Sequence, residues 1–252
     1  MFDLNKVYVG DCMNLIKDID DKSIDVSFTS PPYNRVHRHD KYDYYEDTRS
    51  DYYDMLVNIT DEMLRVTKDY VIVNIQCTRF NKKEFYSYIG HFANKINVTV
   101  IWTKSNPQPA SNRREINNVN VTSVTNAFEY FIFLKDGEDF VKYGDSQFRN
   151  VVTSTVNTRH IEGHGAIMKK EICIDLLKAF TKKDDIILDP FFGTGTTGVC
   201  ALELGRKFIG FEIVPEYVGV AQQRIDATLC GYNEEQMNAK AVKLNQKGVK
   251  LF

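Results

Sequence analysis

The tetrapeptide Ser30-Pro31-Pro32-Tyr33 brings together groups that could hold a planar base. Two consecutive prolines lack backbone donors and have a fixed φ, so they end the apolar run before them in a stiff, extended corner. This corner presents a hydroxyl group on Ser30, a carbonyl group without a local partner on Pro31 and an aromatic ring on Tyr33. Such groups could bind a base that carries an amino group, whereas a bare Pro-Pro sequence alone indicates only a rigid turn.

A second stretch, residues 186–197, reads Ile-Ile-Leu-Asp-Pro-Phe-Phe-Gly-Thr-Gly-Thr-Thr. An apolar strand ends at Asp189 and enters a Gly-x-Gly turn, where the backbone can approach a ligand and the N–H groups of the next helix point at it. The following strand ends at Glu212, whose carboxylate could hold two ribose hydroxyls. Asp-Pro-Phe stands where a dinucleotide site keeps small residues. The pattern therefore predicts an adenosyl ligand without a diphosphate, and S-adenosylmethionine fits.

A third acidic residue, Asp11, follows a short strand at 7–9 and Gly10. It would lie at the carboxyl edge of the sheet, where open α/β folds bind ligands. The same position suits an N-cap of the next helix. Both interpretations stay open at this point.

The periodicity of apolar residues predicts strands that alternate with helices. Strands are expected at 7–9, 24–28, 70–75, 96–102, 128–134, 186–189 and 207–212, and the main helices at 51–68, 170–180, 199–204 and 215–225. This alternation favours an α/β fold whose sheet is covered on both faces. We expect residues 140–143 to return as the hairpin partner of the strand 128–134, and residues 144–165 to be irregular.

The composition of the 252 residues, 43% hydrophobic and 26% charged, predicts a globular domain with a sizeable core. No apolar run approaches the ~20 residues of a membrane span, and the N-terminus lacks a signal-peptide pattern. Five scattered cysteines indicate reduced thiols and a cytoplasmic location. The net charge of −2 means that nucleic acid would have to bind to a local patch. His37-x-His39 lacks a companion ligand, so no metal site is predicted.

Ser30–Tyr33 and the stretch 189–197 together resemble the amino-methyltransferases of DNA, which methylate the exocyclic amine of adenine or cytosine. The tetrapeptide precedes the cofactor loop, as in their circularly permuted beta class. The resemblance covers nearly the whole chain and implies a Rossmann-like methyltransferase fold with a mixed, mostly parallel sheet. It implies a catalytic core at 1–104 and 160–230, a small inserted target-recognition region with a hairpin at 105–159, and a C-terminal tail at 231–252.

The resemblance also implies roles for individual residues. The catalytic residues are Ser30, Pro31, Pro32 and Tyr33. The cofactor-binding residues are Asp11, Cys12, Ser30, His164, Ala166, Ile167, Asp189, Pro190, Phe191, Gly193, Thr194, Gly195, Thr196, Thr197, Glu212 and Ile213. The DNA-binding residues are Arg35, Arg38, Lys104, Asn106, Arg113, Arg114 and Arg159. Residues 164–169 lack the proline that family members often carry there.

The implied reaction uses S-adenosylmethionine and a base flipped out of double-stranded DNA. A serine at the first position of the tetrapeptide is seen more with cytosine in this family, so cytosine N4 is favoured and adenine N6 is the alternative. RNA or protein methyltransferases usually place the cofactor loop before the tetrapeptide, and a non-catalytic DNA-binding regulator would leave that loop unexplained. A homodimer and a cognate restriction endonuclease are the further partners to test, and no membrane partner is expected.

Overall fold

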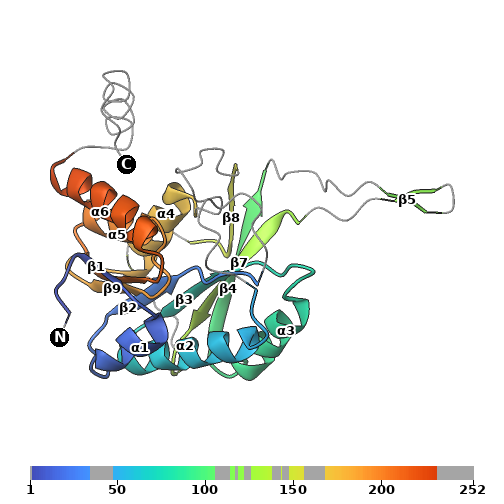
Figure 1. The fold of residues 1–252 in the computed structure, drawn as a ribbon, viewed down its shortest axis with the longest axis horizontal. Coiled ribbons are helices and arrows are strands. Elements are labelled where there is room, and N and C mark those ends of the chain that lie inside the picture. The colour runs from blue at the N-terminus through green and yellow to red at the C-terminus, as the bar shows by residue number, and fades with distance from the viewer. Residues whose placement is uncertain are drawn as a thin grey trace, which may run out of the picture.

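A mixed sheet of eight strands forms the centre of the computed structural model (Figure 1). The structure describes residues 2–34, 48–105, 114–116, 119–121, 126–137, 143, 148–155 and 168–231. The sheet order is β1-β10-β9-β2-β3-β7-β4-β8, and β7 alone runs antiparallel to its neighbours. The strands are β1 (Lys6–Val9), β2 (Val26–Thr29), β3 (Val71–Ile75), β4 (Ile96–Lys104), β7 (Phe128–Leu134), β8 (Val151–Ser154), β9 (Ile186–Asp189) and β10 (Lys207–Glu212).

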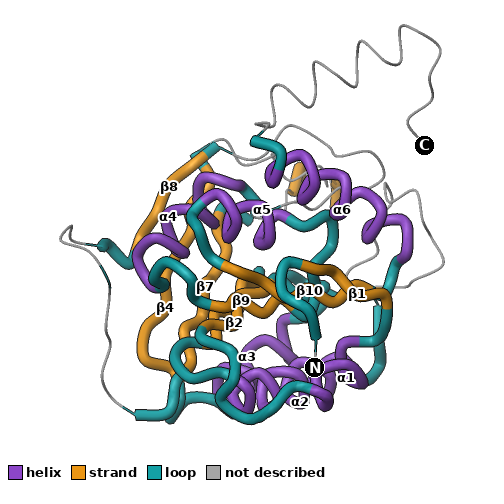
Figure 2. The backbone as a smooth tube through the Cα atoms, turned by 90° about the vertical axis from the view of Figure 1, so that its left-hand side faces the viewer, coloured by secondary structure: helices purple, strands orange, loops and turns teal. Residues whose placement is uncertain are grey.

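Helices cover both faces of this sheet, as Figures 1 and 2 show. One face packs against α1 (Cys12–Leu15), the short 3-10 helix η1 (Ile16–Asp18), α2 (Tyr52–Val66) and α3 (Lys82–His91). The other face packs against α4 (Lys170–Phe180), α5 (Thr196–Glu203) and α6 (Pro215–Leu229). None of the helices in the described part of the chain is both long and apolar enough to cross a membrane.

The alternation of side chains in β3 explains how one strand serves two cores. Val71, Val73 and Ile75 enter the core under α2 and α3, whereas Ile72 enters the core under α4. Because successive strand residues point to opposite faces, a continuous apolar run is what a doubly covered strand requires. The predicted α/β fold, with a mostly parallel sheet and helices on both faces, is confirmed.

The order of strands reverses between β9 and β2, which lie side by side and run parallel. From β9 the chain continues through α5 to β10 on one side, and from β2 it continues through α2 to β3 on the other. Such a reversal opens a crevice beyond the carboxyl ends of the strands, where α/β folds bind ligands. The corner after β2 and the glycine loop after β9 therefore begin at the same point of the sheet edge.

Two expectations for the segment 126–165 are wrong. The strand β7 pairs with β3 on one edge and with β4 on the other, so it has no free edge for residues 140–143 as a hairpin partner. Residues 151–154, expected to be irregular, form the edge strand β8 beside β4. Both differences arise from pairing between distant segments, which a local pattern does not reveal.

The predicted target-recognition region, 105–159, thus contributes two strands to the main sheet. Within it, β5 (Arg114–Ile116) and β6 (Val119–Val121) pair antiparallel as a separate two-stranded sheet. The boundaries of this region, the tail at 231–252 and the circular permutation stay predictions.

Candidate active site

The Pro-Pro corner is fixed by hydrogen bonds from Tyr52 at the start of α2 and from Arg49 just before this helix. The backbone after the buried strand β2 turns out of the sheet at Ser30, and the Tyr52 hydroxyl donates to the Pro32 carbonyl at 2.7 Å. The Arg49 backbone N–H donates to the Asn34 side-chain oxygen at 2.7 Å. Because both ends of the corner are held, its side chains have defined directions.

Asn74 joins the two polar side chains of the corner. Its Oδ1 accepts hydrogen bonds from the Ser30 hydroxyl at 3.2 Å and from the Tyr33 hydroxyl at 3.0 Å. Its Nδ2 donates to the Tyr130 carbonyl at 3.2 Å, which sets the orientation of the amide. Ser30 Oγ lies 3.2 Å from both Asn74 Oδ1 and the Tyr33 hydroxyl oxygen. With its proton directed at either of these oxygens, Ser30 Oγ keeps lone pairs that accept hydrogen bonds.

Glu129 forms the other side of this polar cluster. Its Oε2 lies 3.0 Å from the Tyr33 hydroxyl, and its Oε1 forms an ion pair with Lys104. Burial, followed by the Glu129 charge, raises the pKa of Tyr33 well above its usual value. Tyr33 is therefore a neutral phenol that donates a hydrogen bond. Lys104, predicted to bind DNA, directs its ammonium group at Glu129 and lies 5.3 Å from the Trp102 ring centroid.

The glycine loop after β9 bends back over the end of β10. Gly193 and Gly195 have φ angles of 53° and 84°, in the region that favours glycine. Glu212 binds the loop, since its Oε2 accepts a hydrogen bond from the Gly193 N–H at 2.7 Å. Its Oε1 accepts a hydrogen bond from the Val214 N–H at 2.9 Å. Burial raises the pKa of Glu212. Each carboxylate oxygen keeps a lone pair for a further donor.

Asp189 links the glycine loop to the corner. Its Oδ1 accepts from the Thr29 hydroxyl at 2.7 Å and from the Phe191 N–H at 3.1 Å. Thr29 and Asp189 are 160 residues apart in the sequence, and their hydrogen bond joins the two stretches that the sequence singled out. Burial raises the pKa of Asp189 to about 6, although hydrogen bonds from Thr29 and Thr197 oppose this rise.

The raised pKa of Asp189 predicts a dependence of stability on pH. A carboxyl group whose pKa rises from 3.8 to about 6 on folding binds its proton more tightly in the folded state. Its contribution to stability therefore grows as the pH falls from about 7 to about 4. We expect the free energy of unfolding of the wild type, minus that of Asp189→Asn, to increase by about 3 kcal/mol over this range. Urea unfolding at several pH values measures this difference.

The same substitution at the exposed Asp175 is the control, because it adds an amide without changing the site. A wild-type-minus-variant difference that is flat with pH would show that Asp189 does not titrate as its burial requires.

The buried Phe192 ring packs between the glycine loop and the strand β10. It stacks on Phe208, with the centroids 5.2 Å apart, and packs against Gly198 and Gly210. A Cβ atom on Gly198 would lie 2.5 Å from the Phe192 Cζ, and one on Gly210 would lie 2.7 Å from its Cε2. These two glycines leave the space that the ring fills.

Substitution of Gly210 by alanine is therefore expected to destabilise the fold by about 1–3 kcal/mol, because the buried ring cannot move without disturbing its stack on Phe208. The measurement is urea unfolding, with Gly219→Ala as control. Nothing lies within 4 Å of a Cβ atom at Gly219, which is inside α6. The control should gain up to about 1 kcal/mol. Equal stability of Gly210→Ala and the wild type would contradict this packing.

Asp11 and Cys12 lie next to Glu212 at the sheet edge. The Gly10 N–H donates to the Glu212 backbone carbonyl at 2.9 Å, and Asp11 Oδ1 caps α1 by accepting from the Met13 N–H at 2.9 Å. Asp11 is therefore the N-cap of α1 and lies at the carboxyl edge of the sheet, and its contact with a ligand stays a prediction. Burial raises the pKa of Cys12 to about 12, so this thiol stays protonated.

Several of the predicted site residues lie outside the described residues. They are His164, Ala166 and Ile167 for the cofactor, and Arg35, Arg38, Asn106, Arg113 and Arg159 for DNA. Arg114 is described only as a backbone position in β5. The remaining predicted residues gather at the edge formed by the ends of β1, β10, β9, β2 and β4.

The sequence analysis missed Asn74 and Glu129 as site residues. Asn74 is 1% exposed and is a polar residue in the otherwise apolar strand β3, and Glu129 is a charge at the start of the apolar strand β7. A polar side chain inside an apolar strand signals either a hydrogen-bonded core residue or a site residue. The contact of Asn74 with Tyr33 depends on the pairing of β2 with β3, in which Thr29 faces Val73. The contact of Glu129 with Tyr33 depends on the pairing of β3 with β7, in which Ile75 faces Tyr130.

The acidic side chains of the edge suit a particular kind of ligand. Asp189 and Glu212 are both buried, and in the described part of the chain neither forms an ion pair. A ligand with hydroxyl donors and a positive charge would satisfy them, because buried carboxylates require donors or countercharge. An adenosyl ligand with a sulfonium group has both properties.

Comparison with known proteins agrees with this geometry. Residues 24–223 match the DNA methylase family, N6_N4_Mtase. The chain is 28% identical to the Type II methyltransferase M.HinfI of Haemophilus influenzae over 88% of this chain and 68% of that protein. The fold is similar to the structure of the PvuII DNA methyltransferase, described as cytosine-N4-specific, with a TM-score of 0.71 and 20% identity. This match covers 86% of this chain and 85% of the PvuII chain. The M1.HpyAVI–SAM complex covers 87% of this chain, with 98% of that chain covered, a TM-score of 0.60 and 21% identity.

The chain belongs to the DNA methylase family, because the family match spans most of its length. The predicted enzyme class, an S-adenosylmethionine-dependent DNA methyltransferase with a Rossmann-like fold, is confirmed at this level. Membership does not distinguish cytosine from adenine as the target base.

Proposed function

We propose that the Pro-Pro corner and the glycine loop form one site, which methylates the N4 amine of cytosine in double-stranded DNA. The observation that carries this proposal is the 2.7 Å hydrogen bond from Thr29 to Asp189. It joins the residue before Ser30 to the residue that opens the loop. A group bound by the corner and a group bound by the loop would thus be neighbours, as transfer between them requires.

The loop side of the site holds the methyl donor. S-adenosylmethionine supplies an electrophilic methyl group on a sulfonium centre. Glu212 accepts the ribose hydroxyls with the lone pairs that Gly193 and Val214 leave free. Asp189 and Phe191, together with the turn at Gly193 and Gly195, form the cradle, while Asp11 and Cys12 lie along the adenine. His164, Ala166 and Ile167 are assigned to the methionine part by the resemblance.

The corner side of the site activates the amine. The lone pair of an exocyclic amine is delocalised into the base, so the nitrogen is a weak nucleophile. Ser30 Oγ and the Pro31 carbonyl each accept one N–H, which localises the lone pair and aims it at the methyl group. The N–C bond forms as the S–C bond breaks, the sulfur keeps the bonding electron pair, and the excess proton leaves to solvent.

Asn74 and Glu129 act as positioning residues. Asn74 Oδ1 accepts a hydrogen bond from the Ser30 hydroxyl, and the lone pairs of Ser30 Oγ then serve as acceptors. Both residues hold the Tyr33 hydroxyl, which fixes the ring that stacks on the flipped base. The Pro-Pro sequence keeps the corner extended, so these groups stay in place before the base arrives.

We choose cytosine as the target base because a serine, Ser30, stands at the first position of the tetrapeptide, and serine at that position is seen more with cytosine in the family that the chain resembles. The cytosine-N4-specific description of the PvuII enzyme supports this choice. The Type II description of M.HinfI supports a role in restriction–modification with a cognate endonuclease. The recognition of a particular sequence is assigned to 107–124 and 144–160, with Arg35 and Arg38 closing over the DNA. A homodimer would extend this small recognition region.

Single-molecule sequencing of DNA from cells that express the protein tests the proposal. We expect N4-methylcytosine at one short sequence, and a much lower modified fraction of that sequence in cells that express Ser30→Ala at the same level. N6-methyladenine at such a sequence would overturn the choice of base but not the site. Unmodified DNA from cells that contain folded wild-type protein would overturn the function.

A further inference from the structure

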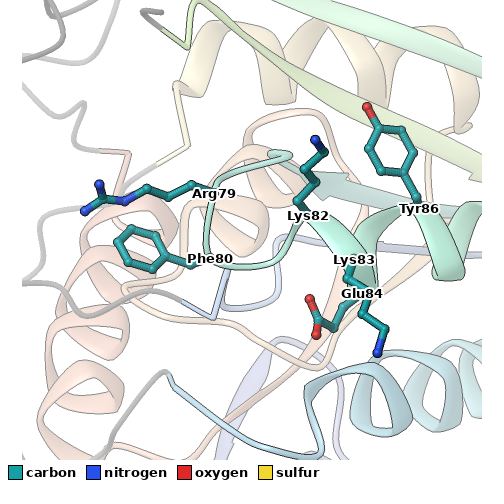
Figure 3. A pocket seen from close by; sticks show the side chains of 6 residues that line it. All are labelled: Arg79, Phe80, Lys82, Lys83, Glu84 and Tyr86. Carbon is teal, nitrogen blue, oxygen red and sulfur yellow. The ribbon is translucent and has the colours of Figure 1, made fainter. Parts of the chain in front are cut away.

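The loop after β3 and the start of α3 carry an exposed group of basic and aromatic side chains that the proposed site does not use. We name the group formed by Arg79, Phe80, Lys82 and Tyr86 the β3–α3 patch. Together with Lys83 and Glu84 it lines a surface hollow of about 430 Å³ (Figure 3). Phe80 is 47% exposed and Tyr86 is 59% exposed, which is unusual for large aromatic side chains.

The backbone of this loop is held firmly from inside. Asn81 is fully buried, and its Oδ1 accepts from the Thr78 N–H at 2.7 Å and from the Thr78 hydroxyl at 2.9 Å. Its Nδ2 donates to the Gln76 carbonyl at 3.0 Å. The guanidinium group of Arg79 lies 4.6 Å from the centroid of the Phe80 ring. Phe80 therefore serves as a platform that limits the orientations of Arg79.

The patch is joined to the proposed active site through the start of β7. The Asn126 side chain donates to the Cys77 carbonyl at 2.8 Å, which ties the loop to the residues before β7. The Tyr86 ring packs against Phe85 at 5.3 Å, and Phe85 packs against Tyr130 at 5.2 Å. The Tyr130 carbonyl is the group that orients Asn74 in the site. The patch thus lies beside the edge at which the flipped base would bind.

The basic side chains around this hollow stand apart from acidic partners in the part of the chain that the structure describes. Within the described residues, Arg79, Lys82 and Lys83 form no ion pair. Figure 3 shows Lys82 and Tyr86 projecting to one side of α3, while Lys83 and Glu84 project to the other. Among the six side chains drawn, Lys82 is the charged group on the side of Tyr86, and Glu84 is on the other side. The whole chain has a net charge of −2, so any attraction to a polyanion has to come from a local surface of this kind.

We infer that the β3–α3 patch binds the phosphate backbone of the DNA beside the flipped base, an inference that rests on the proposed function. Arg79 and Lys82 each contact a phosphate group, and Phe80 supports Arg79. Contacts of this kind position a duplex without reading its sequence. The patch would therefore contribute to affinity for any DNA, and the choice of target would be made elsewhere.

The salt dependence of DNA binding tests this inference. Fluorescence anisotropy gives the Kd of the full-length protein for a short labelled, unmethylated duplex at a series of salt concentrations. In the double variant Arg79→Gln/Lys82→Gln, the slope of log Kd against log salt should be smaller by about 1.8, roughly 0.9 for each phosphate group that is no longer neutralised. The KM for genomic DNA should rise, while kcat at saturating DNA stays at the wild-type value. Lys83→Gln, on the opposite side of α3, should keep the wild-type slope.

The outcomes distinguish this inference from the proposed function. Wild-type protein that neither binds the duplex nor methylates DNA would overturn both. Wild-type protein that binds and methylates, with an unchanged salt slope in the double variant, would overturn the inference alone. An unchanged slope with an altered sedimentation coefficient would assign the patch to a protein contact and overturn the inference in the same way.

Discussion

Substitution of Ser30 by alanine is expected to lower kcat for methyl transfer by about a hundredfold, with the affinity for S-adenosylmethionine unchanged. Ser30 Oγ is one of two acceptors for the target amine, and its proton is already engaged by Asn74 at 3.2 Å. The alanine variant lacks that acceptor. Its glycine loop, which lies beyond the Thr29–Asp189 hydrogen bond, is unchanged, so cofactor binding should be unchanged as well. Single-turnover transfer of a tritiated methyl group measures the rate, and calorimetry measures cofactor binding.

Asn74 provides the matched test of the hydrogen-bond arrangement around Ser30. If Asn74 acts by orienting the Ser30 hydroxyl, then Asn74→Ala alone should lower kcat for methyl transfer. The same substitution in the Ser30→Ala variant should lower kcat little further. Losses that multiply in full in the double variant would show that Asn74 acts independently of Ser30. Wild-type turnover in Ser30→Ala would remove the corner from the mechanism.

Glu212→Gln is expected to raise the Kd for S-adenosylmethionine by about a hundredfold, because a charge-assisted hydrogen bond contributes about 1.5–3 kcal/mol. The carboxylate accepts from Gly193 and Val214 and keeps lone pairs for two ribose hydroxyls. An amide NH₂ in place of one oxygen would face a backbone N–H and would offer no acceptor to the ribose. Calorimetry with the purified variant measures the change.

The exposed Glu216 in the first turn of α6 gives the control, since Glu216→Gln removes the same charge outside the site. Circular dichroism should show that both variants are folded at the temperature of the measurement. Wild-type affinity in a folded Glu212→Gln variant would exclude the ribose assignment.

The arrangement of the two informative stretches could be predicted from the sequence because it follows from a general property of parallel sheets. Each stretch comes directly after an apolar run, and parallel strands present their carboxyl ends at one edge. The structure places Thr29 and Asp189 at hydrogen-bonding distance across that edge. The positions of the strands and helices could also be predicted, because they follow from apolar periodicity, which is a local property of the chain.

The supporting residues could not be predicted because they depend on which strands pair. Asn74 reaches Tyr33 because β3 pairs with β2, the strand before the corner. Glu129 reaches Tyr33 because β7 lies between β3 and β4, whereas the sequence favoured a hairpin partner for β7. The ion pair of Lys104 with Glu129 depends on the same strand pairing, because Glu129 is on the neighbouring strand β7. The predicted DNA-binding role of Lys104 stays a prediction.

The central claim is that the corner and the glycine loop form one site for methyl transfer to an exocyclic amine of DNA. Incubation of the purified protein with tritiated S-adenosylmethionine and unmethylated duplex DNA, followed by digestion and chromatography of the nucleosides, tests it most directly. We expect the label in N4-methylcytosine with the wild type, and an initial rate of labelling about a hundredfold lower with Ser30→Ala. Label at a ring carbon, or equal label with Ser30→Ala, would contradict the account.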